Sequence, residues 1–277
     1  MINFKNIRQL APMFYKLLVY FNFIKRCAKD DTASDYSYTY RNLVFRKEIF
    51  KLNKHAFNII LFKEGLDKVG DGQVLFAPNH QSFADIITMF LSSDRAIGFV
   101  SKKETKDLPK TIATGMKAIG NVLIDRDDLR SEVIAFKQIN TILEENKDLS
   151  YVVFPEGTRS KPPEFKLGDF HSGSFKIATK LGIPIVPVCI YGDKRILDKH
   201  VHLKKYPVQI KFLDPITSDE YDKITPIELS DMIHQRMEKE LSILKSNDYK
   251  LLQVLNNYSD KKLDKLKKVE QNKRDNF

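Results

Sequence analysis

The sequence contains no tryptophan and only two cysteines, Cys27 and Cys189, among its 277 residues. The two cysteines stand far apart in the chain and have no metal-ligand spacing around them. This pattern argues against a disulfide framework and favours a reducing compartment. We therefore expect both cysteines to be apolar filler, and we expect neither to act as a nucleophile.

Long uncharged hydrophobic runs are also missing. Residues 10–24 are strongly apolar, but Pro12 and Lys16 interrupt them, and the uncharged piece Leu17 to Ile24 that follows is short. A helix that crosses about 30 Å of hydrocarbon needs about 20 residues. Lys16 inside the apolar run, and the basic Lys25-Arg26 after it, also argue against a cleaved signal peptide. We expect a soluble or interfacial protein.

The net charge of +10 is not spread evenly over the chain. Residues 1–29 hold six basic and no acidic side chains, residues 244–277 hold nine basic and five acidic ones, and the section between is balanced at 31 of each. A nucleic-acid-binding protein usually carries its positive charge on a folded face, often interleaved with aromatic residues. The balanced centre argues against nucleic acid and favours an anionic surface that the two ends meet.

The N-terminal part shows two helical patterns. Residues 12–26 carry apolar side chains at helical spacing between basic ends, which predicts an amphipathic helix. This helix either packs on the domain or lies in the headgroup layer of a membrane, where each nearby Lys or Arg contributes about 1 kcal/mol. A second helix is expected from about Tyr40 to Lys63. We therefore expect residues 1–65 to be a helical pair that docks on a membrane.

From Gly70 onward, short apolar runs alternate with helical stretches. This alternation predicts an α/β domain, over residues 66–244, with a mostly parallel central sheet flanked by helices. The expected strands are 73–77, 96–101, 122–124, 151–154 and 185–191, with a half-buried closing strand around 208–212. The expected helices are 83–91, 109–119, 129–145, 173–181 and 226 to about 244, the last with Pro226 in its first turn. Residues 245–277 are expected to be a lysine-rich helical or disordered tail.

Polar residues follow three of the expected strands, and in an open α/β domain function concentrates at such strand exits. At the first exit, His80 precedes Asp85 by five residues. Asp85 would lie in the first turn of the next helix and could fold back on the imidazole, fix its tautomer and make it a general base. Ser82 and Asp85 equally fit a helix cap and its acidic third residue, which would make Asp85 purely structural.

The second and third exits carry the arginines. Arg126 follows the strand at 122–124, where it and Asp125 either serve a site, or simply pair with each other or cap the next helix. At the third exit, Glu156, Gly157 and Arg159 stand in the loop FPEGTRS. Two arginines from separate strand ends could hold one phosphomonoester, because the guanidinium fork matches phosphate geometry. Glu156 would orient these arginines or the substrate, or would only be their structural ion-pair partner.

Together these stretches resemble the glycerolipid acyltransferase family, and within it the 1-acylglycerol-3-phosphate (lysophosphatidic acid) acyltransferases. Four blocks stand in the family's order: Asn79-His80 with Asp85, Gly120 to Arg126, FPEGTRS at 154–160, and the proline block at 183–188. Lys102-Lys103-Glu104 is a further similar element. The resemblance covers about residues 74–192. Phe165-Lys166-Leu167-Gly168 departs from the family's usual Phe-Lys-Lys-Gly by one lysine.

The resemblance implies direct acyl transfer from a thioester to the sn-2 hydroxyl of lysophosphatidic acid, which forms phosphatidic acid without an acyl-enzyme. A backbone N–H would stabilise the oxyanion. The implied roles are general base for His80, orienting partner for Asp85, and acceptor binding for Lys103, Arg126, Glu156, Gly157 and Arg159. We expect no metal and no cofactor besides the donor, since thioesters are already activated and the histidines show no ligand pair at helical spacing.

The expected partners are membrane lipids with the lysophosphatidic acid, and either acyl-CoA or acyl carrier protein as donor. The expected location is the cytoplasmic face of the membrane, at which the protein is peripheral or interfacial. Glycerol-3-phosphate or another lysophospholipid remains an alternative acceptor. A non-enzymatic membrane adaptor would explain the basic ends but gives no reason for His80, Arg126 and Arg159 at three strand exits.

Overall fold

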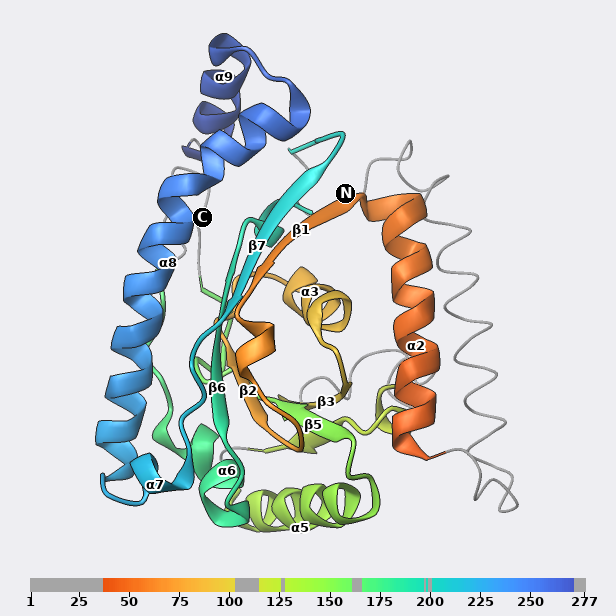
Figure 1. Ribbon diagram of the computed structural model, residues 1–277, viewed down its shortest axis with the longest axis vertical. Helices are drawn as coiled ribbons and strands as arrows, with labels where there is room; N and C mark the ends of the chain where they lie inside the picture. Colours follow the sequence, from red (N-terminus) through yellow and green to blue (C-terminus); the bar gives the residue numbers. More distant parts are fainter. Residues whose placement is uncertain are drawn as a thin grey trace.

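The computed structural model describes residues 37–102, 115–125, 128–160, 166–196, 198 and 201–271. In these residues a seven-stranded sheet has the order β1-β7-β6-β2-β5-β3-β4 (Figure 1). The strands are β1 (Ile59–Glu64), β2 (Leu75–Pro78), β3 (Ala96–Lys102), β4 (Val122–Ile124), β5 (Leu149–Val152), β6 (Ile185–Tyr191) and β7 (Tyr206–Phe212). The amphipathic segment expected over residues 12–26 lies outside the described residues.

The described α-helices are α2 (Tyr38–Leu52), α3 (Ala84–Ser92), α5 (Leu129–Glu145), α6 (Lys176–Leu181), α7 (Ser218–Tyr221), α8 (Pro226–Asn256) and α9 (Asp260–Gln271). Shorter helical turns are η2 (Asn53–Phe57), η3 (Leu66–Lys68), η5 (Ser172–Phe175) and η6 (Asp193–Arg195). Pro226 lies in the first turn of α8, as predicted, and Thr225 with Glu228 forms a capping box there. Within the described ranges, no helix is both long and apolar enough to cross a membrane.

The sheet is mostly parallel, which confirms the predicted α/β class. Neighbouring strands run parallel everywhere except between β6 and β7. β7 lies inside the sheet, between β1 and β6, and most of its residues are buried. The prediction of a half-buried closing strand was therefore wrong, because α8 covers the face that was expected to meet water.

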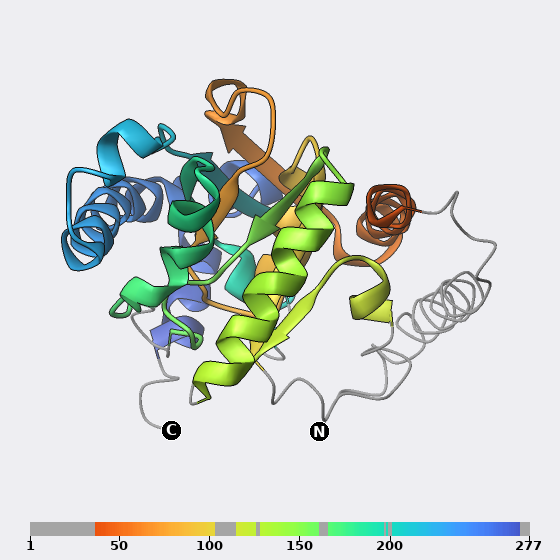
Figure 2. The same ribbon diagram turned by 90° about the horizontal axis from the view of Figure 1, so that it is seen from below.

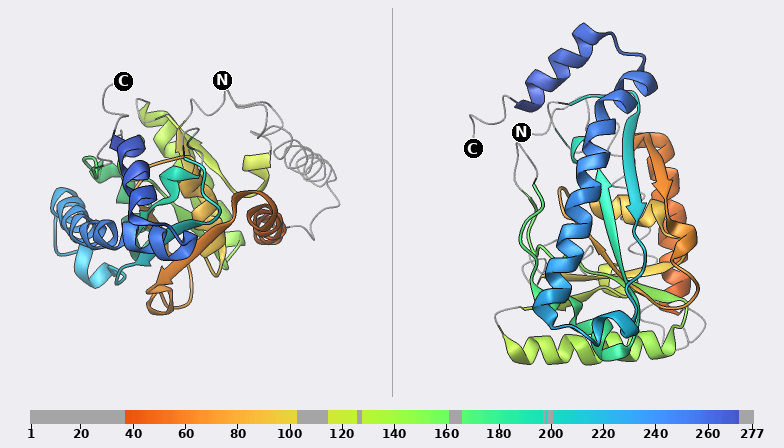
Figure 3. Two further views of the ribbon diagram at one scale, coloured as in Figure 1. Left: turned by 90° about the horizontal axis from the view of Figure 1, so that it is seen from above. Right: turned by 60° about the vertical axis from the view of Figure 1, so that its left-hand side comes forward.

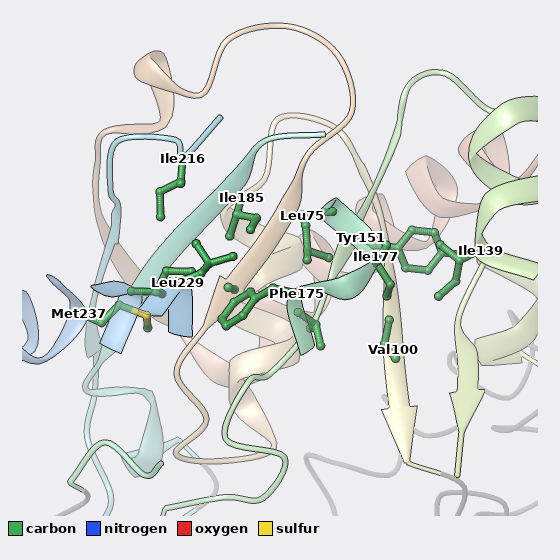
Figure 4. Close-up of a cluster of buried hydrophobic side chains, with 14 of the residues drawn as sticks. Leu75, Val100, Ile139, Tyr151, Phe175, Ile177, Ile185, Ile216, Leu229 and Met237 are labelled. Carbon is green, nitrogen blue, oxygen red and sulfur yellow. The ribbon is translucent and has the colours of Figure 1, made fainter. Parts of the chain in front are cut away.

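Helices cover both faces of the sheet. In Figure 1, α2 and α3 lie on one side of the strands and α8 lies on the other; the view from below in Figure 2 shows α5 across the end of the sheet near β4. The central strands β2, β3, β5 and β6 divide their side chains between two apolar clusters. Phe76 belongs to the cluster under α2 and α3, whereas Leu75 and Ala77 belong to the cluster under α5, α6 and α8 (Figure 4). Burial on both faces explains why these strands read as continuous apolar runs.

The helix expected from Tyr40 to Lys63 ends early. α2 stops at Leu52, and after η2 the chain turns at Asn58 in a left-handed conformation and enters β1, which pairs in parallel with β7. The side chain of Asn53 fixes this turn, since its amide donates to the carbonyl of Ile59 and its oxygen accepts from the N–H of the same residue. Local spacing did not reveal the strand because its partner lies far away in the sequence.

The predicted boundary at residue 65 was also wrong for the described part of the N-terminal region. Phe45 of α2 packs edge to face on Phe90 of α3 at 4.9 Å. The buried Asn42 donates to the carbonyl of Ile97 at 2.5 Å and accepts from its N–H at 3.1 Å. Residues from Tyr38 to Glu64 are therefore an integral part of the α/β domain.

The predicted division at Leu244 falls in the middle of a helix. α8 continues to Asn256, and α9 follows it at the far end (Figure 3). Arg195 of η6 is almost fully buried and forms ion pairs with Asp248 of α8 and Glu270 of α9. Residues 245–271 are thus ordered helices joined to the domain, because two of their acidic residues neutralise a buried arginine.

Candidate active site

The site lies where β2 and β5 end. These two strands are adjacent and parallel, with Phe76 opposite Val152, so the loops that follow them leave the same edge of the sheet. Asn79 aligns the first loop with the neighbouring β6: its side chain donates to the carbonyl of Ile190 at 3.1 Å and accepts from the N–H of Ile190 at 2.7 Å. These bonds place His80, the next residue, directly beyond the sheet.

His80 and Asp85 form the hydrogen-bonded pair that the sequence predicted. Nδ1 of His80 lies 2.6 Å from Oδ2 of Asp85, which sits in the first turn of α3 and is fully buried. The same Oδ2 also accepts from the backbone N–H groups of Gln81, at 2.7 Å, and Ser82, at 3.0 Å. The alternative in which Ser82 caps the helix is not realised, because the N-cap of α3 is Phe83 and has no side-chain cap bond. Asp85 nevertheless has a structural role, since one carboxylate both fastens the loop and holds the imidazole.

The electrostatics of the pair favour a neutral imidazole beside a carboxylate. Burial raises the pKa of Asp85 to about 6, although its hydrogen bonds oppose this rise. Burial and the positive charge of Arg159 lower the pKa of His80 to about 4. At neutral pH, Nδ1–H of His80 therefore donates to the Asp85 carboxylate, and Nε2 keeps a lone pair that can accept a proton.

An aromatic side chain fixes the plane of the imidazole. The ring of Phe154, at the exit of β5, stacks on His80 with centroids 4.0 Å apart and an angle of 24° between the planes. Sequence reasoning assigned no role to Phe154, although it is the first residue of the FPEGTRS block. The sequence feature that could have indicated this role is the position of Phe154 at the end of a buried strand, because the neighbouring strand β2 leads to His80.

Glu156 binds backbone groups. Its Oε1 accepts from the N–H of His80 at 2.6 Å, its Oε2 accepts from the N–H of Gly168 at 2.9 Å, and the residue is buried. Burial raises the pKa of Glu156 to about 7, against the effect of the two backbone donors. Among the described residues Glu156 forms no ion pair with Arg159. Arg126 lies outside the described residues, so the expectation that Glu156 orients the arginines or the substrate stays a prediction.

Further contacts join the loop after β2, the loop after β5 and the stretch around Gly168. Ser160 donates to the carbonyl of His80 from its N–H, at 2.8 Å, and from its hydroxyl, at 3.2 Å. Gly157 turns the chain with a φ of +65°, which favours glycine. A Cβ on Gly168 would lie 3.0 Å from Oε2 of Glu156, so the close approach of this backbone explains the glycine in the stretch that resembles Phe-Lys-Lys-Gly.

The structure places only part of the expected anion-binding set. Arg159 is exposed at the exit of β5, where its charge acts on the pKa of His80. Lys103 and Arg126 lie outside the described residues. The capping interpretation of the second exit was wrong for Asp125, because the side chain of Asp128 accepts from the N–H of Arg130 at 2.9 Å and caps α5.

Other reactive groups are poorly placed in the described part of the chain. Cys189 is buried, and burial raises the pKa of its thiol far above the ordinary value, so thiolate is scarce. The hydroxyl of Ser82 accepts from the N–H of Ala84 at 2.9 Å at the start of α3. Among the described residues, no three His, Cys, Asp or Glu side chains are grouped so that they could hold a metal ion.

Residues 61–191 match the family model described as Acyltransferase. The chain is 38% identical over 136 residues to the chloroplastic 1-acyl-sn-glycerol-3-phosphate acyltransferase of Arabidopsis thaliana, a match that covers 48% of this chain and 36% of the plant protein. It is 32% identical over 158 residues to the 1-acyl-sn-glycerol-3-phosphate acyltransferase of Helicobacter pylori, covering 56% of this chain and 65% of that protein. The chain thus spans well under half the length of the plant relative.

The fold has a solved counterpart. The crystal structure of the 1-acyl-sn-glycerophosphate acyltransferase from Thermotoga maritima matches with a TM-score of 0.60 and 23% sequence identity. The match covers 86% of this chain and 97% of that chain. It therefore includes regions outside the segment that the sequence relatives share, and it shows the same arrangement of a mostly parallel sheet between helices.

Proposed function

We propose that this chain, of which residues 61–191 match the acyltransferase family model, transfers an acyl chain from a thioester to the sn-2 hydroxyl of 1-acylglycerol-3-phosphate. The product of this reaction is phosphatidic acid. The observation that carries the proposal is the buried pair of His80 and Asp85, in which a carboxylate fixes Nδ1 and leaves Nε2 as a base. The names of the relatives supply the acceptor class.

In the proposed reaction, Nε2 of His80 takes the proton of the acceptor hydroxyl while the hydroxyl oxygen attacks the thioester carbonyl. The tetrahedral intermediate then collapses, the carbon–sulfur bond breaks, and the departing thiolate takes the proton back from His80. Asp85 stabilises the imidazolium that exists between the two steps. No covalent intermediate on the protein is proposed, since Cys189 is buried and the Ser82 hydroxyl is engaged at the start of α3.

Arg159 supports a phosphorylated acceptor. It leaves the strand next to β2 and its charge reaches His80, so an anion bound to it would lie near the base. We propose that Arg159 binds the acceptor phosphate together with Arg126 and Lys103, which follow β4 and β3. In this arrangement Glu156 and Gly157 shape the loop that presents Arg159.

Both substrates carry lipid chains, and we propose that the enzyme works while docked on the cytoplasmic face of a membrane. The six basic residues in the segment 1–29 and the apolar run within it support this placement. The donor would be acyl-CoA or an acyl carrier protein. Either thioester supplies an activated acyl group, so the proposed chemistry needs no metal or other cofactor.

The decisive experiment is turnover by purified protein with lysophosphatidic acid and each donor in turn, followed as thiol release and lipid product. We expect His80→Ala to abolish thiol release while vesicle binding is retained. His202→Ala replaces an exposed histidine far from the strand exits in sequence and serves as the control. Full turnover by His80→Ala would contradict the assignment of the base, and preference for glycerol-3-phosphate or another lysophospholipid in an acceptor panel would replace the proposed acceptor.

A further inference from the structure

A second buried carboxyl group lies behind the pair of His80 and Asp85. Asp193 opens η6, which follows β6, and it is fully buried. The turn before it uses Gly192 at a φ of +101°, where a Cβ would lie 2.6 Å from the carbonyl oxygen of Pro207. Because β6 is the neighbour of β2 and η6 packs on α3, this turn brings the side chain of Asp193 close to that of Asp85.

The hydrogen-bond partners of the two carboxyl groups are unequal. Oδ2 of Asp85 has three donors, whereas Oδ1 of Asp85 and both oxygens of Asp193 are buried and have no donor among the described groups. A buried carboxylate without donors is strongly unfavourable, and such a group keeps its proton instead. A proton on Asp193 would also supply the donor that Oδ1 of Asp85 lacks.

The charges around the carboxyl groups of Asp85 and Asp193 are consistent with one proton shared between them. Burial raises the pKa of Asp193 well above its ordinary value, and the charge of Asp85 raises it further, while the charges of His80 and Lys194 act in the opposite direction. Burial lowers the pKa of Lys194 itself to about 8. Burial raises the pKa of Asp85 to about 6, the charge of Glu156 adds to this rise, and the interaction with Asp193 opposes it.

We propose that Asp193 is protonated in the working enzyme and donates its O–H to Oδ1 of Asp85, so that it is a positioning residue for the His80–Asp85 pair. The effect of Asp193 on catalysis rests on the proposed function, whereas its protonation does not. Asp85 is then held on both sides, by the loop and imidazole N–H groups on Oδ2 and by Asp193 on Oδ1. Its orientation toward Nδ1 of His80 is fixed before the substrate binds, and a single negative charge is kept in the cluster.

Two substitutions separate this role from a merely structural one. Asp193→Asn keeps a neutral donor of the same shape, whereas Asp193→Ala removes the donor. Loss of the donor destabilises the Asp85 carboxylate, so the titration of the pair should move to higher pH in Asp193→Ala and stay near the wild-type position in Asp193→Asn. If Asp193 were ionised, Asn would remove a negative neighbour and would move the titration to lower pH.

The titration is read by nitrogen NMR of the His80 ring, which requires no turnover. In kinetics, we expect Asp193→Ala to lower kcat at least about tenfold, a fraction of the roughly 10²–10⁴ that a general base contributes. Asp193→Asn should stay within about threefold of wild type and so rescue the loss. Asp248→Asn, at another buried carboxyl group, should lower the unfolding temperature without moving the titration.

Infrared difference spectra between wild type and Asp193→Asn at pH 8 test directly whether Asp193 carries a proton. Glu156, whose pKa is raised to about 7, is mostly ionised at this pH and so contributes little to the signal of protonated carboxyl groups. The C=O stretch of a protonated carboxyl group should be present in wild type and lost in Asp193→Asn. An unchanged band, equal titrations in the Asn and Ala variants, or a shift to lower pH with Asn would each overturn the proposal. If wild-type protein showed no acyl transfer, the proposed function would fail while the infrared and NMR results still decided the role of Asp193.

Discussion

Oδ2 of the fully buried Asp85 lies 2.6 Å from Nδ1 of the partly exposed His80, and the same oxygen accepts from two backbone N–H groups of the loop between them. The carboxylate that would orient the base is therefore also the group that shapes the loop around it. Any change at Asp85 acts on the tautomer of the histidine and on the loop together.

Asp85→Asn should lower kcat by about 10²–10⁴, the range that general base catalysis contributes. An amide oxygen can still accept from the loop, but its uncharged group no longer stabilises an imidazolium. The measurement is steady-state thiol release with circular dichroism to verify folding. Asp214→Asn, at an exposed residue that pairs with Lys68, is the matched control. Retained turnover in Asp85→Asn would remove Asp85 from the mechanism.

Activity should fall as the pH is lowered through about 6, the pKa to which burial raises Asp85. Below this pH the buried pair takes up a proton, so His80 can no longer both donate to a carboxylate and accept from the substrate. The raised pKa also means that protonation of Asp85 favours the folded state, so its stabilising effect is lost as the pH rises through the same range. A pH profile of kcat checks this; constant kcat down to pH 5 would contradict it.

Glu156→Gln should destabilise the fold by about 1–3 kcal/mol, the usual cost of leaving a buried donor unsatisfied. Both oxygens of Glu156 accept backbone N–H groups, and the glutamine amide presents a donor to one of them. We also expect kcat to fall, since the His80 loop loses its anchor. Urea unfolding measures the stability. Glu144→Gln, on the exposed face of α5, is expected to change it by less than about 0.5 kcal/mol.

Arg195→Ala should lower the free energy of unfolding by about 3–5 kcal/mol, because Asp248 and Glu270 lose their guanidinium partner in a mostly buried site, although Glu270 keeps the hydrogen bond from the Tyr249 hydroxyl. Arg195 lies 2.5 Å from Oδ2 of Asp248 and also pairs with Glu270. Arg236→Ala, which breaks the exposed 3.6 Å pair with Glu220, should cost at most about 1 kcal/mol. Equal unfolding midpoints for the two variants would show that the buried network does not hold α8 and α9 to the domain.

Deletion of residues 1–29 should release the protein from anionic vesicles, because it removes six basic side chains and the apolar run. Vesicle sedimentation at several salt concentrations measures the partition. The truncated protein should retain its fold by circular dichroism and turn over a soluble, short-chain acceptor. Unchanged partition would show that the segment packs on the domain instead of docking on the membrane.

The strands and helices that the sequence predicted correctly share one property: their signal is local. The segments 122–124, 129–145 and 185–191 agree with β4, α5 and β6 at both ends, since continuous apolar runs and helical spacing are written in adjacent residues. Residues 59–64 carry four apolar side chains that fit a helix or a strand equally well. Only pairing with β7, far away in the sequence, decides between them.

The same distinction applies to the site. The spacing of His80 and Asp85 allowed their contact to be predicted, because five residues suffice to fold one side chain back on the other. Glu156 was expected to orient the arginines or the substrate, and the folded loops in addition present two backbone N–H groups to its oxygens, which no sequence pattern reveals. Asp193 was overlooked because a Gly-Asp turn after a strand is common and its burial depends on α3.

The sequence by itself determined the α/β class, the strand exits that carry polar residues and the His80–Asp85 spacing, since each is encoded in neighbouring side chains. Tertiary structure alone decided that residues 59–64 form a strand, that α8 and α9 are part of the domain, and that Asp193 lies against Asp85. These features depend on which segments, far apart in the sequence, pack against each other and exclude water between them. Burial then sets hydrogen-bond partners and pKa values, and it arises only when the whole chain has folded.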